Sequence, residues 1–184
     1  MPSESDVKLR IFGLVPDSIV DGPGLRYGIF VQGCSHACPG CHNPESQPAC
    51  GGTLHGIDAI YDDIRGNKLV KGVTFSGGEP FEQAEGCAAL AKRLKEDGYD
   101  IWAYSGYTFE SLIEKSKCDE AVSDFLDSVD VLVDGPYVES LHSYELDWRG
   151  SSNQRLLDVP KSLAAGAPVE WRAPSFEMPS IPTW

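Results

Sequence analysis

The segment RYGIFVQGCSHACPGCH, residues 26–42, joins a run rich in β-branched and aromatic residues to a loop that contains three cysteines. The first part, Arg26–Gln32, has the composition of a β-strand. The second part places Cys34, Cys38 and Cys41 in a C-x3-C-x2-C pattern among glycine and proline, which favour turns. A strand that runs directly into such a loop predicts an α/β protein with its chemistry at the carboxyl ends of its strands.

Further strands and helices alternate along the chain. Strand-like composition marks Leu9–Val15, Gly72–Ser76, Tyr99–Ser105 and Val129–Asp134. Apolar residues at helical spacing predict helices at residues 57–64, 84–94, 109–115 and 120–126. This alternation is typical of right-handed βαβ units and a mainly parallel sheet. A closed eight-stranded barrel takes ~250 residues, and this chain has 184. We therefore expect an α/β fold in the form of a partial, open barrel.

The end of the chain has a different composition. Five of the thirteen prolines lie at or beyond Pro160. We therefore predict one domain at residues 1–159 and, at residues 160–184, a proline-rich irregular tail that packs on this domain or extends from it. Val169–Arg172 is a candidate edge strand within the tail.

The charge of the chain excludes some classes of partner. There are 28 acidic and 15 basic side chains, a formal net charge of −13, whereas binding to nucleic acid or to an anionic membrane needs clustered Lys and Arg. Eleven acids and two lysines lie between Glu110 and Asp147, and a solvated helical face accounts for them better than an acidic docking surface. No apolar run reaches the roughly 18–20 residues that cross a bilayer, and residues 1–8 do not resemble a signal peptide. We expect a cytoplasmic protein.

Four distinctive turns follow four of the predicted strands. If the strands are parallel, these turns meet at one edge of the sheet and form a single site. The turns are Gly33–His42, Gly77–Pro80, Gly106–Thr108 and Gly135–Pro136.

The cysteine loop predicts a metal site. Closely spaced thiolates select zinc or an iron–sulfur cluster, and three cysteines would leave one iron of a 4Fe-4S cluster without a protein ligand. Two alternatives are a structural Cys3His zinc site completed by His36 or His42, and buried cysteines without a metal. The other cysteines are interpreted as structural: Cys87 as a small core residue, Cys50 as a residue of a Gly/Pro-rich loop, and Cys118 as a residue near a helix start.

The C-x3-C-x2-C pattern followed by Gly77-Gly78-Glu79-Pro80 resembles the radical S-adenosylmethionine (SAM) superfamily. Within it, Asp21-Gly22-Pro23-Gly24-Leu25-Arg26 is similar to the glycyl-radical-enzyme activases. Residues 105–108, 131–136 and 148–155 further resemble the activases of anaerobic (class III) ribonucleotide reductase. The resemblance covers about Leu9 to Arg155.

This resemblance implies a set of site residues. The three cysteines of the loop would hold a 4Fe-4S cluster whose fourth iron binds the amino and carboxylate groups of SAM. Arg149, Asn153 and Arg155 are further candidates for contacts with SAM or with the partner's glycine loop. Asp134 is a candidate to orient the bound substrate loop or to bind a cation, and the alternative is a strand-end Asp that caps a turn. The cofactor-binding residues implied by the resemblance are Gly77 and Gly78 along the methionyl group, Glu79 on its ammonium, Gly40, Cys41 and His42 at the adenosyl group, and Ser105 at the ribose or carboxylate.

The resemblance also implies the reaction and the partners. One electron cleaves SAM to methionine and a 5′-deoxyadenosyl radical, which takes a hydrogen atom from a glycine of the large subunit of anaerobic ribonucleoside-triphosphate reductase. The electron comes from a donor such as flavodoxin, and no separate acid–base residue is required. The alternatives are an activase of another glycyl radical enzyme, such as pyruvate formate-lyase, and a zinc-stabilised binding module.

Overall fold

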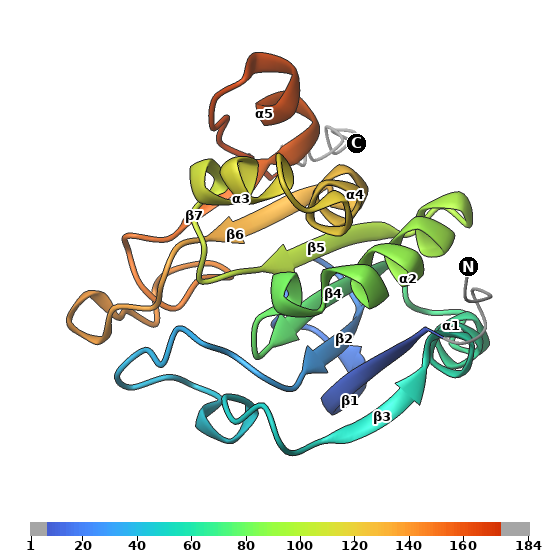
Figure 1. Ribbon diagram of the computed structural model, residues 1–184. Coiled ribbons are helices and arrows are strands. Elements are labelled where there is room, and N and C mark those ends of the chain that lie inside the picture. Colours follow the sequence, from blue (N-terminus) through green and yellow to red (C-terminus); the bar gives the residue numbers. More distant parts are fainter. Residues whose placement is uncertain (1–6, 174–184) are drawn as a thin grey trace, which may run out of the picture.

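The computed structural model describes residues 7–173, which fold around one seven-stranded sheet (Figure 1). The strands follow the sheet order β3-β1-β2-β4-β5-β6-β7. Their bounds are β1 Lys8–Ser18, β2 Arg26–Val31, β3 Thr53–Gly56, β4 Gly72–Gly77, β5 Asp100–Tyr104, β6 Val131–Asp134 and β7 Arg155–Asp158. The helices are α1 Ile57–Gly66, α2 Ala84–Glu96, α3 Phe109–Ser116, α4 Glu120–Ser128 and α5 Val159–Ala165.

The pairing of the strands confirms the predicted α/β fold with an open sheet. The four central strands, β2, β4, β5 and β6, are parallel to one another. Both borders of the sheet are antiparallel: β1 pairs with β2 and β3 on one side, and β7 pairs with β6 on the other. The parallel strands place their carboxyl ends at one edge of the sheet.

Helices α1 to α4 cover one face of the sheet (Figure 1). Each helix packs on the sheet through an apolar face. In helix α2 the apolar residues recur at helical spacing and are buried, including Cys87, Leu90 and Leu94. The thiol of Cys87 is therefore part of the core, as predicted. Capping side chains fix the starts of α3 and α4: the Thr108 hydroxyl accepts from the Ser111 N–H, and the Asp119 carboxylate accepts from the N–H groups at the start of α4.

The opposite face of the sheet is also buried but carries a different set of residues. On β5, Ile101 and Ala103 join the core under the helices, whereas Trp102 belongs to a second cluster on the other face, with Tyr104 packed against it. Because successive side chains of a strand point to opposite faces, the strands have two buried faces and the second face lines the interior of the partial barrel. The charged Arg26 is enclosed there, 2% exposed.

The guanidinium of Arg26 is fully partnered in the interior. Its Nε donates to the Thr74 hydroxyl at 2.7 Å, and its Nη1 donates to the Asp100 carboxylate at 2.6 Å. Its guanidinium carbon also lies 5.2 Å from the ring centroid of Trp102. Burial lowers the pKa of Arg26, and Asp100 opposes this effect. Arg26 thus ties together the amino-terminal ends of β2, β4 and β5, a role that composition alone did not predict.

Strands β3 and β7 and helix α5 were not predicted from the sequence. Strands β3 and β7 are short, and β3 is largely exposed, so neither shows a clear apolar alternation. The prediction that the chain becomes irregular at Pro160 is wrong, because helix α5 begins at Val159. Its Asp158 cap accepts from the Lys161 N–H, and Gly166 ends it in a left-handed conformation (φ 65°). Pro160 lies in the first helical turn, where proline is favoured.

The predicted edge strand at Val169–Arg172 is reduced to a single bridge between Glu170 and Leu157 of β7. Residues 174–184 of the predicted tail lie outside the described residues, and the domain boundary at 159/160 stays a prediction. Within residues 7–173, no helix combines the length and the apolar character that a membrane crossing requires.

Candidate functional site

A cavity of about 450 Å³ opens at the carboxyl ends of the parallel strands. Most of its lining residues come from the ends of β2, β4 and β5 and from the segments after β2, β4, β5 and β6, so the predicted convergence of these four turns is confirmed. Val20 and Asp21, from the segment before β2, also line it. The lining includes Cys34, His36, Cys38, Cys41 and His42 after β2, Ser76, Gly77 and Gly78 at β4, Tyr104, Ser105 and Gly106 at β5, Gly135 and Tyr137 after β6, and Leu146, Trp148, Arg149, Gly150 and Gln154 from the loop that leads to β7.

The cysteine loop is bent so that its three thiols line this cavity. Its start is anchored by main-chain hydrogen bonds from Gly33 N to Ser46 O at 2.7 Å and from Cys34 N to Gln47 O at 2.9 Å. Ala37 (φ 48°) and Gly40 (φ 70°) then take left-handed conformations that curl the chain back. Cys34, Cys38 and Cys41 are free thiols and partly exposed.

The chemistry of this donor set fits a 4Fe-4S cluster. Burial raises the pKa of Cys34 to about 11, and nearby Glu79 and Glu82 add to the increase. A thiolate at this position therefore needs a strong positive partner, which iron supplies. Within residues 7–173, no group of three or more His, Cys, Asp or Glu side chains is placed to hold a metal ion. The cysteines of a cluster do not share one ion, because each binds a different iron.

Gly77, the last residue of β4, and Gly78 allow this turn to pack directly on the cysteine loop. The Gly78 N–H donates to Val31 O at 2.7 Å, and the next N–H, of Glu79, donates to Gly33 O at 2.8 Å. A Cβ atom on Gly78 would lie 2.2 Å from Gly33 O, and one on Gly77 (φ 93°) would lie 2.7 Å from the main chain of Phe30. The glycines are thus required by the packing of the main chain as well as by the cavity that they line.

The carboxylate of Glu79 is buried, 1% exposed, and joins three segments of the site. It accepts hydrogen bonds from Phe81 N at 3.0 Å, from the Ser105 hydroxyl at 3.0 Å and from Gly106 N at 2.8 Å. It also bonds to His36 Nε2 at 2.8 Å, and this bond raises the pKa of His36. Glu79 lies behind the cavity lining, so its predicted contact with a ligand ammonium stays a prediction.

The sequence matches the family described as a 4Fe-4S single cluster domain over residues 20–157. It is also 36% identical over 147 residues to the anaerobic ribonucleoside-triphosphate reductase-activating protein of Escherichia coli K12, covering 76% of this chain and 92% of that protein. The protein of this name from Salmonella typhimurium is 36% identical over 154 residues, covering 79% and 96%. The one from Enterobacteria phage T4 is 34% identical over 149 residues, covering 78% and 90%.

The chain belongs to the anaerobic ribonucleoside-triphosphate reductase-activating protein family. The matched range, residues 20–157, includes every residue that lines the cavity. The crystal structure of QueE from Escherichia coli is similar with a TM-score of 0.43 and 15% identity, covering 57% of this chain and 55% of that one.

Of the other predicted cofactor-binding residues in this member of the activating-protein family, some line the cavity and one does not. Cys41, His42 and Ser105 line the cavity, whereas Gly40 lies outside the lining, and a Cβ there would meet the Glu139 side chain at 2.7 Å. Tyr137 packs 4.8 Å from the ring of His42, between centroids. The assignment of these residues to the adenosyl group remains a prediction.

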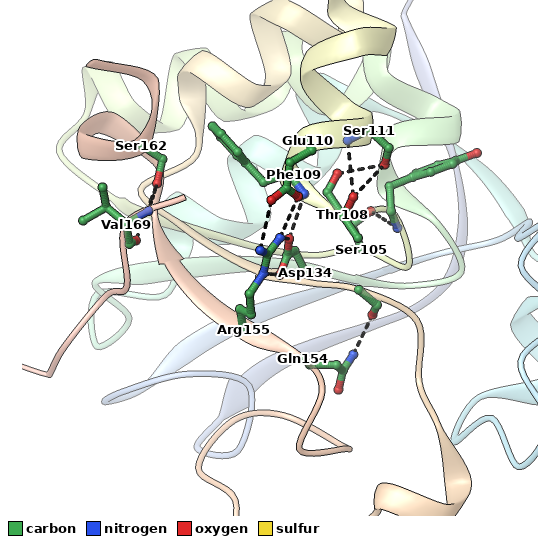
Figure 2. Close-up of polar contacts among 12 residues, drawn as sticks. Ser105, Thr108, Phe109, Glu110, Ser111, Asp134, Gln154, Arg155, Ser162 and Val169 are labelled. Carbon is green, nitrogen blue, oxygen red and sulfur yellow. Dashed lines mark hydrogen bonds and ion pairs between the residues drawn. The ribbon is translucent and has the colours of Figure 1, made fainter. Parts of the chain in front are cut away.

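Asp134 and Arg155, two candidates for ligand contacts, are engaged with each other (Figure 2). The buried Asp134 carboxylate accepts from Arg155 Nε at 2.9 Å and from Phe109 N, at the start of α3, at 2.7 Å. Arg155 Nη2 also pairs with Glu110 at 2.8 Å. This network fastens α3 to β6 and β7. The third candidate, Asn153, donates to Pro136 O at 2.8 Å.

Arg149 is the only Lys or Arg among the described residues that line the cavity. Its Nη1 donates to Gln154 O at 2.9 Å, while its Nε is buried and lacks a hydrogen-bond partner in the described part of the chain. The Gln154 side chain holds the loop, because its amide oxygen accepts from Gly150 N at 2.9 Å. Its nitrogen donates to Gly135 O at 3.0 Å (Figure 2).

Several lining residues were not singled out from the sequence. Trp148 has a positive φ of 52°, a conformation that costs about 1–3 kcal/mol outside glycine and persists only where the surroundings enforce it. Tyr104 and Tyr137 are ordinary aromatic residues in sequence and reach the cavity through the ends of β5 and β6. Their positions next to strand ends were the signal that could have identified them.

Proposed function

We propose that this protein activates an anaerobic ribonucleoside-triphosphate reductase by reductive cleavage of SAM. The observation that carries the proposal is the single cavity that brings together the three cysteines, the Gly77–Gly78 turn and Ser105, all within the range matched by the family. The chemistry supplied by a 4Fe-4S cluster bound to these cysteines is one low-potential electron, which breaks the S–C5′ bond of SAM to give methionine and a 5′-deoxyadenosyl radical.

The residues of the chain bind and orient the ligand in this proposal. Gly77 and Gly78 present main chain without side chains, so that the methionyl group can approach closely. Arg149 offers the cavity a permanent positive charge for the ligand carboxylate. Glu79 would need to give up part of its present hydrogen bonding to reach the ammonium, or act on it through Ser105.

The protein walls of the cavity keep water away from a reactive radical. Tyr104, Tyr137 and Trp148 line this cavity together with the glycine turn, and exclusion of water prevents loss of reactive intermediates. With SAM held in this cavity, a radical formed there would take a hydrogen atom from the backbone glycine of the partner, which would yield 5′-deoxyadenosine and a glycyl radical. The partner is the large subunit of the reductase, and the open sheet leaves a side through which a peptide loop reaches the cavity.

The electron donor and the cellular location complete the proposal. A donor such as flavodoxin supplies the electron in the cytoplasm, where thiols stay reduced. The six cysteines are all free thiols in the structure, which agrees with such a compartment. The net charge of −13 agrees with the absence of nucleic acid and membrane partners.

Anaerobic reconstitution tests the proposal. The protein, loaded with iron and sulfide, is mixed with SAM, a reductant and the large subunit of the reductase, and the glycyl radical is measured by electron paramagnetic resonance. We expect a radical on the reductase, together with one 5′-deoxyadenosine per radical formed. A radical formed on pyruvate formate-lyase but not on the reductase would overturn the choice of partner.

The metal content separates the proposal from a zinc-stabilised binding module. Protein purified without oxygen should be brown and contain about four iron and four sulfide per chain. A colourless protein with one tightly bound zinc under the same conditions would refute the cluster. The variant Cys87→Ala serves as the control, because its thiol is buried in the core and should not affect the metal content.

A further inference from the structure

The segment after residue 157 lies beyond the range matched by the family and packs back on β7. After helix α5 the chain returns along this strand, with main-chain hydrogen bonds from Asp158 N to Val169 O at 2.9 Å and from Trp171 N to Leu156 O at 2.8 Å. The Ser162 hydroxyl accepts from Val169 N at 2.9 Å and closes the turn (Figure 2). The indole of Trp171 is thereby delivered to the inner face of the sheet.

Three tryptophans meet on this inner face. Trp171 lies edge-to-face with Trp102, with ring centroids 5.0 Å apart, and with Trp148, at 5.8 Å. Trp102 and Trp148 complete the triangle at 5.6 Å. Edge-to-face packing of aromatic rings is the favoured geometry and adds to the effect of burial. Each ring therefore restrains the other two.

One corner of this triangle is also part of the cavity wall. Trp148 lines the cavity, and its left-handed conformation (φ 52°) must be enforced by its surroundings. The surroundings on its inner side are the rings of Trp102 and Trp171. The next residue, Arg149, is the sole Lys or Arg of the lining within the described residues, so the position of Trp148 also sets where this charge lies.

A second cavity, of about 480 Å³, lies on the other side of the same wall. Trp148 and Arg149 line both cavities, and Trp171 lines the second. The wall is thus one loop thick at this point. Gln154 holds the loop at Gly150, whereas Trp148 itself is held by its ring contacts with Trp102 and Trp171.

We propose that Trp171 is a positioning residue for the SAM cavity and that it acts by holding Trp148 and Arg149 in the wall. The segment beyond the family match then contributes to ligand affinity without touching the ligand. This proposal rests on the proposed function, because SAM is the ligand that it concerns.

The test compares Trp171→Ala with Trp171→Phe in the anaerobically reconstituted protein. SAM affinity is measured by equilibrium dialysis without reductant. The rate of hydrogen–deuterium exchange is measured separately for each peptide of the protein. We expect Trp171→Ala to raise the dissociation constant for SAM at least fivefold and to speed exchange in residues 146–154, with no change in residues 72–77. Trp171→Phe should restore most of the affinity, because an aromatic ring still fills the corner.

Leu163→Ala is the matched control. Leu163 lies on helix α5 of the same segment and packs against the main core, away from the tryptophan triangle. The substitution Leu163→Ala should lower the melting temperature of the protein while leaving its SAM affinity and the hydrogen–deuterium exchange of residues 146–154 unchanged. Equal effects of Leu163→Ala and Trp171→Ala on affinity would overturn the proposal in favour of a general loss of stability, as would wild-type affinity and exchange in Trp171→Ala.

Failure of the proposed function has a different signature. If the wild-type protein does not bind SAM, the proposed function is wrong, and the exchange of residues 146–154 still decides whether Trp171 holds the wall. Faster exchange in Trp171→Ala but not in Leu163→Ala would then support the positioning role alone, and unchanged exchange would reject it.

Discussion

The carboxylate of Glu79 accepts a hydrogen bond from the main-chain N–H of Gly106 at 2.8 Å, so the turn after β4 is fastened to the turn after β5. Both turns border the cavity, and the carboxylate itself is enclosed behind them. A residue predicted from its motif as a ligand contact is therefore also a structural joint of the site. Loss of the structural role should lower the stability of the apoprotein, whereas loss of the ligand contact should weaken SAM binding only.

Glu79→Gln should destabilise the protein before any ligand is added. The amide replaces a carboxylate oxygen by an N–H group that faces the donors at Gly106 or His36. Hydrogen bonds to a charged group contribute about 1.5–3 kcal/mol, so we expect a loss of this size in urea unfolding of the apoprotein. Glu96→Gln, at an exposed carboxylate at the end of α2, is the control and should change stability by less than about 0.5 kcal/mol. Unchanged stability of Glu79→Gln with weaker SAM binding would assign the carboxylate to the ligand alone.

Gly78→Ala should disrupt the contact between the β4 turn and the cysteine loop. The added Cβ meets the carbonyl oxygen of Gly33, which is main chain and cannot rotate away. Overpacking of this kind costs about 1–3 kcal/mol, measured by the midpoint of chemical unfolding. Gly66→Ala, at the end of α1 with open space around it, should be neutral or slightly stabilising. Equal stability of the two variants would show that the turn can relax without loss.

Substitution of each cluster cysteine should abolish SAM cleavage. Cys34→Ala, Cys38→Ala and Cys41→Ala each remove one of the three thiols that line the cavity, so the purified variants should lose the brown colour and form no 5′-deoxyadenosine. Cys87→Ala should retain cleavage and lose about 1 kcal/mol of stability through the smaller core side chain. Full cleavage by Cys38→Ala would contradict the ligand assignment.

The ion pair between Glu110 and Arg155 predicts a dependence of stability on pH. The hydrogen bonds that the Arg155 guanidinium donates to Glu110 lower the pKa of Glu110 from 4.5 to about 2. A carboxyl group whose pKa is lower in the folded state than in the unfolded state stabilises the protein when the pH is above the unfolded-state pKa. This contribution is lost as the pH falls from about 4.5 toward about 2.

The magnitude of this contribution is small, because Glu110 is more than half exposed. After allowance for solvent screening we expect about 1 kcal/mol or less. Melting temperatures of the apoprotein between pH 6 and pH 3 should fall less steeply in Glu110→Gln than in the wild type. Parallel curves for the two proteins would show that the pair contributes nothing measurable.

The sequence alone predicted the elements whose signals are local. The apolar runs of β2, β4, β5 and β6 and the periodicity of helices α1 to α4 identified the central sheet and the helical layer, because both faces of these strands or one face of these helices must be buried. The spacing of the three cysteines likewise predicted a metal site, since a loop of eight residues can bring them to one cavity wherever the loop lies.

The borders of the fold depended on the tertiary structure. Strands β3 and β7 are strands because β1 and β6 offer free edges, and their own residues give only a weak signal. Helix α5 begins beside a proline that in isolation suggests a break.

Long-range contacts decided the details of the site. The three tryptophans at positions 102, 148 and 171 meet through the pairing of β5, β6 and β7, and no local pattern predicts an encounter between residues so far apart in the chain. The burial of the Glu79 carboxylate depends in the same way on donors from two other loops. Sequence spacing therefore determined which atoms the site contains, whereas the packing of distant segments decided which of those atoms face the cavity and which hold it in place.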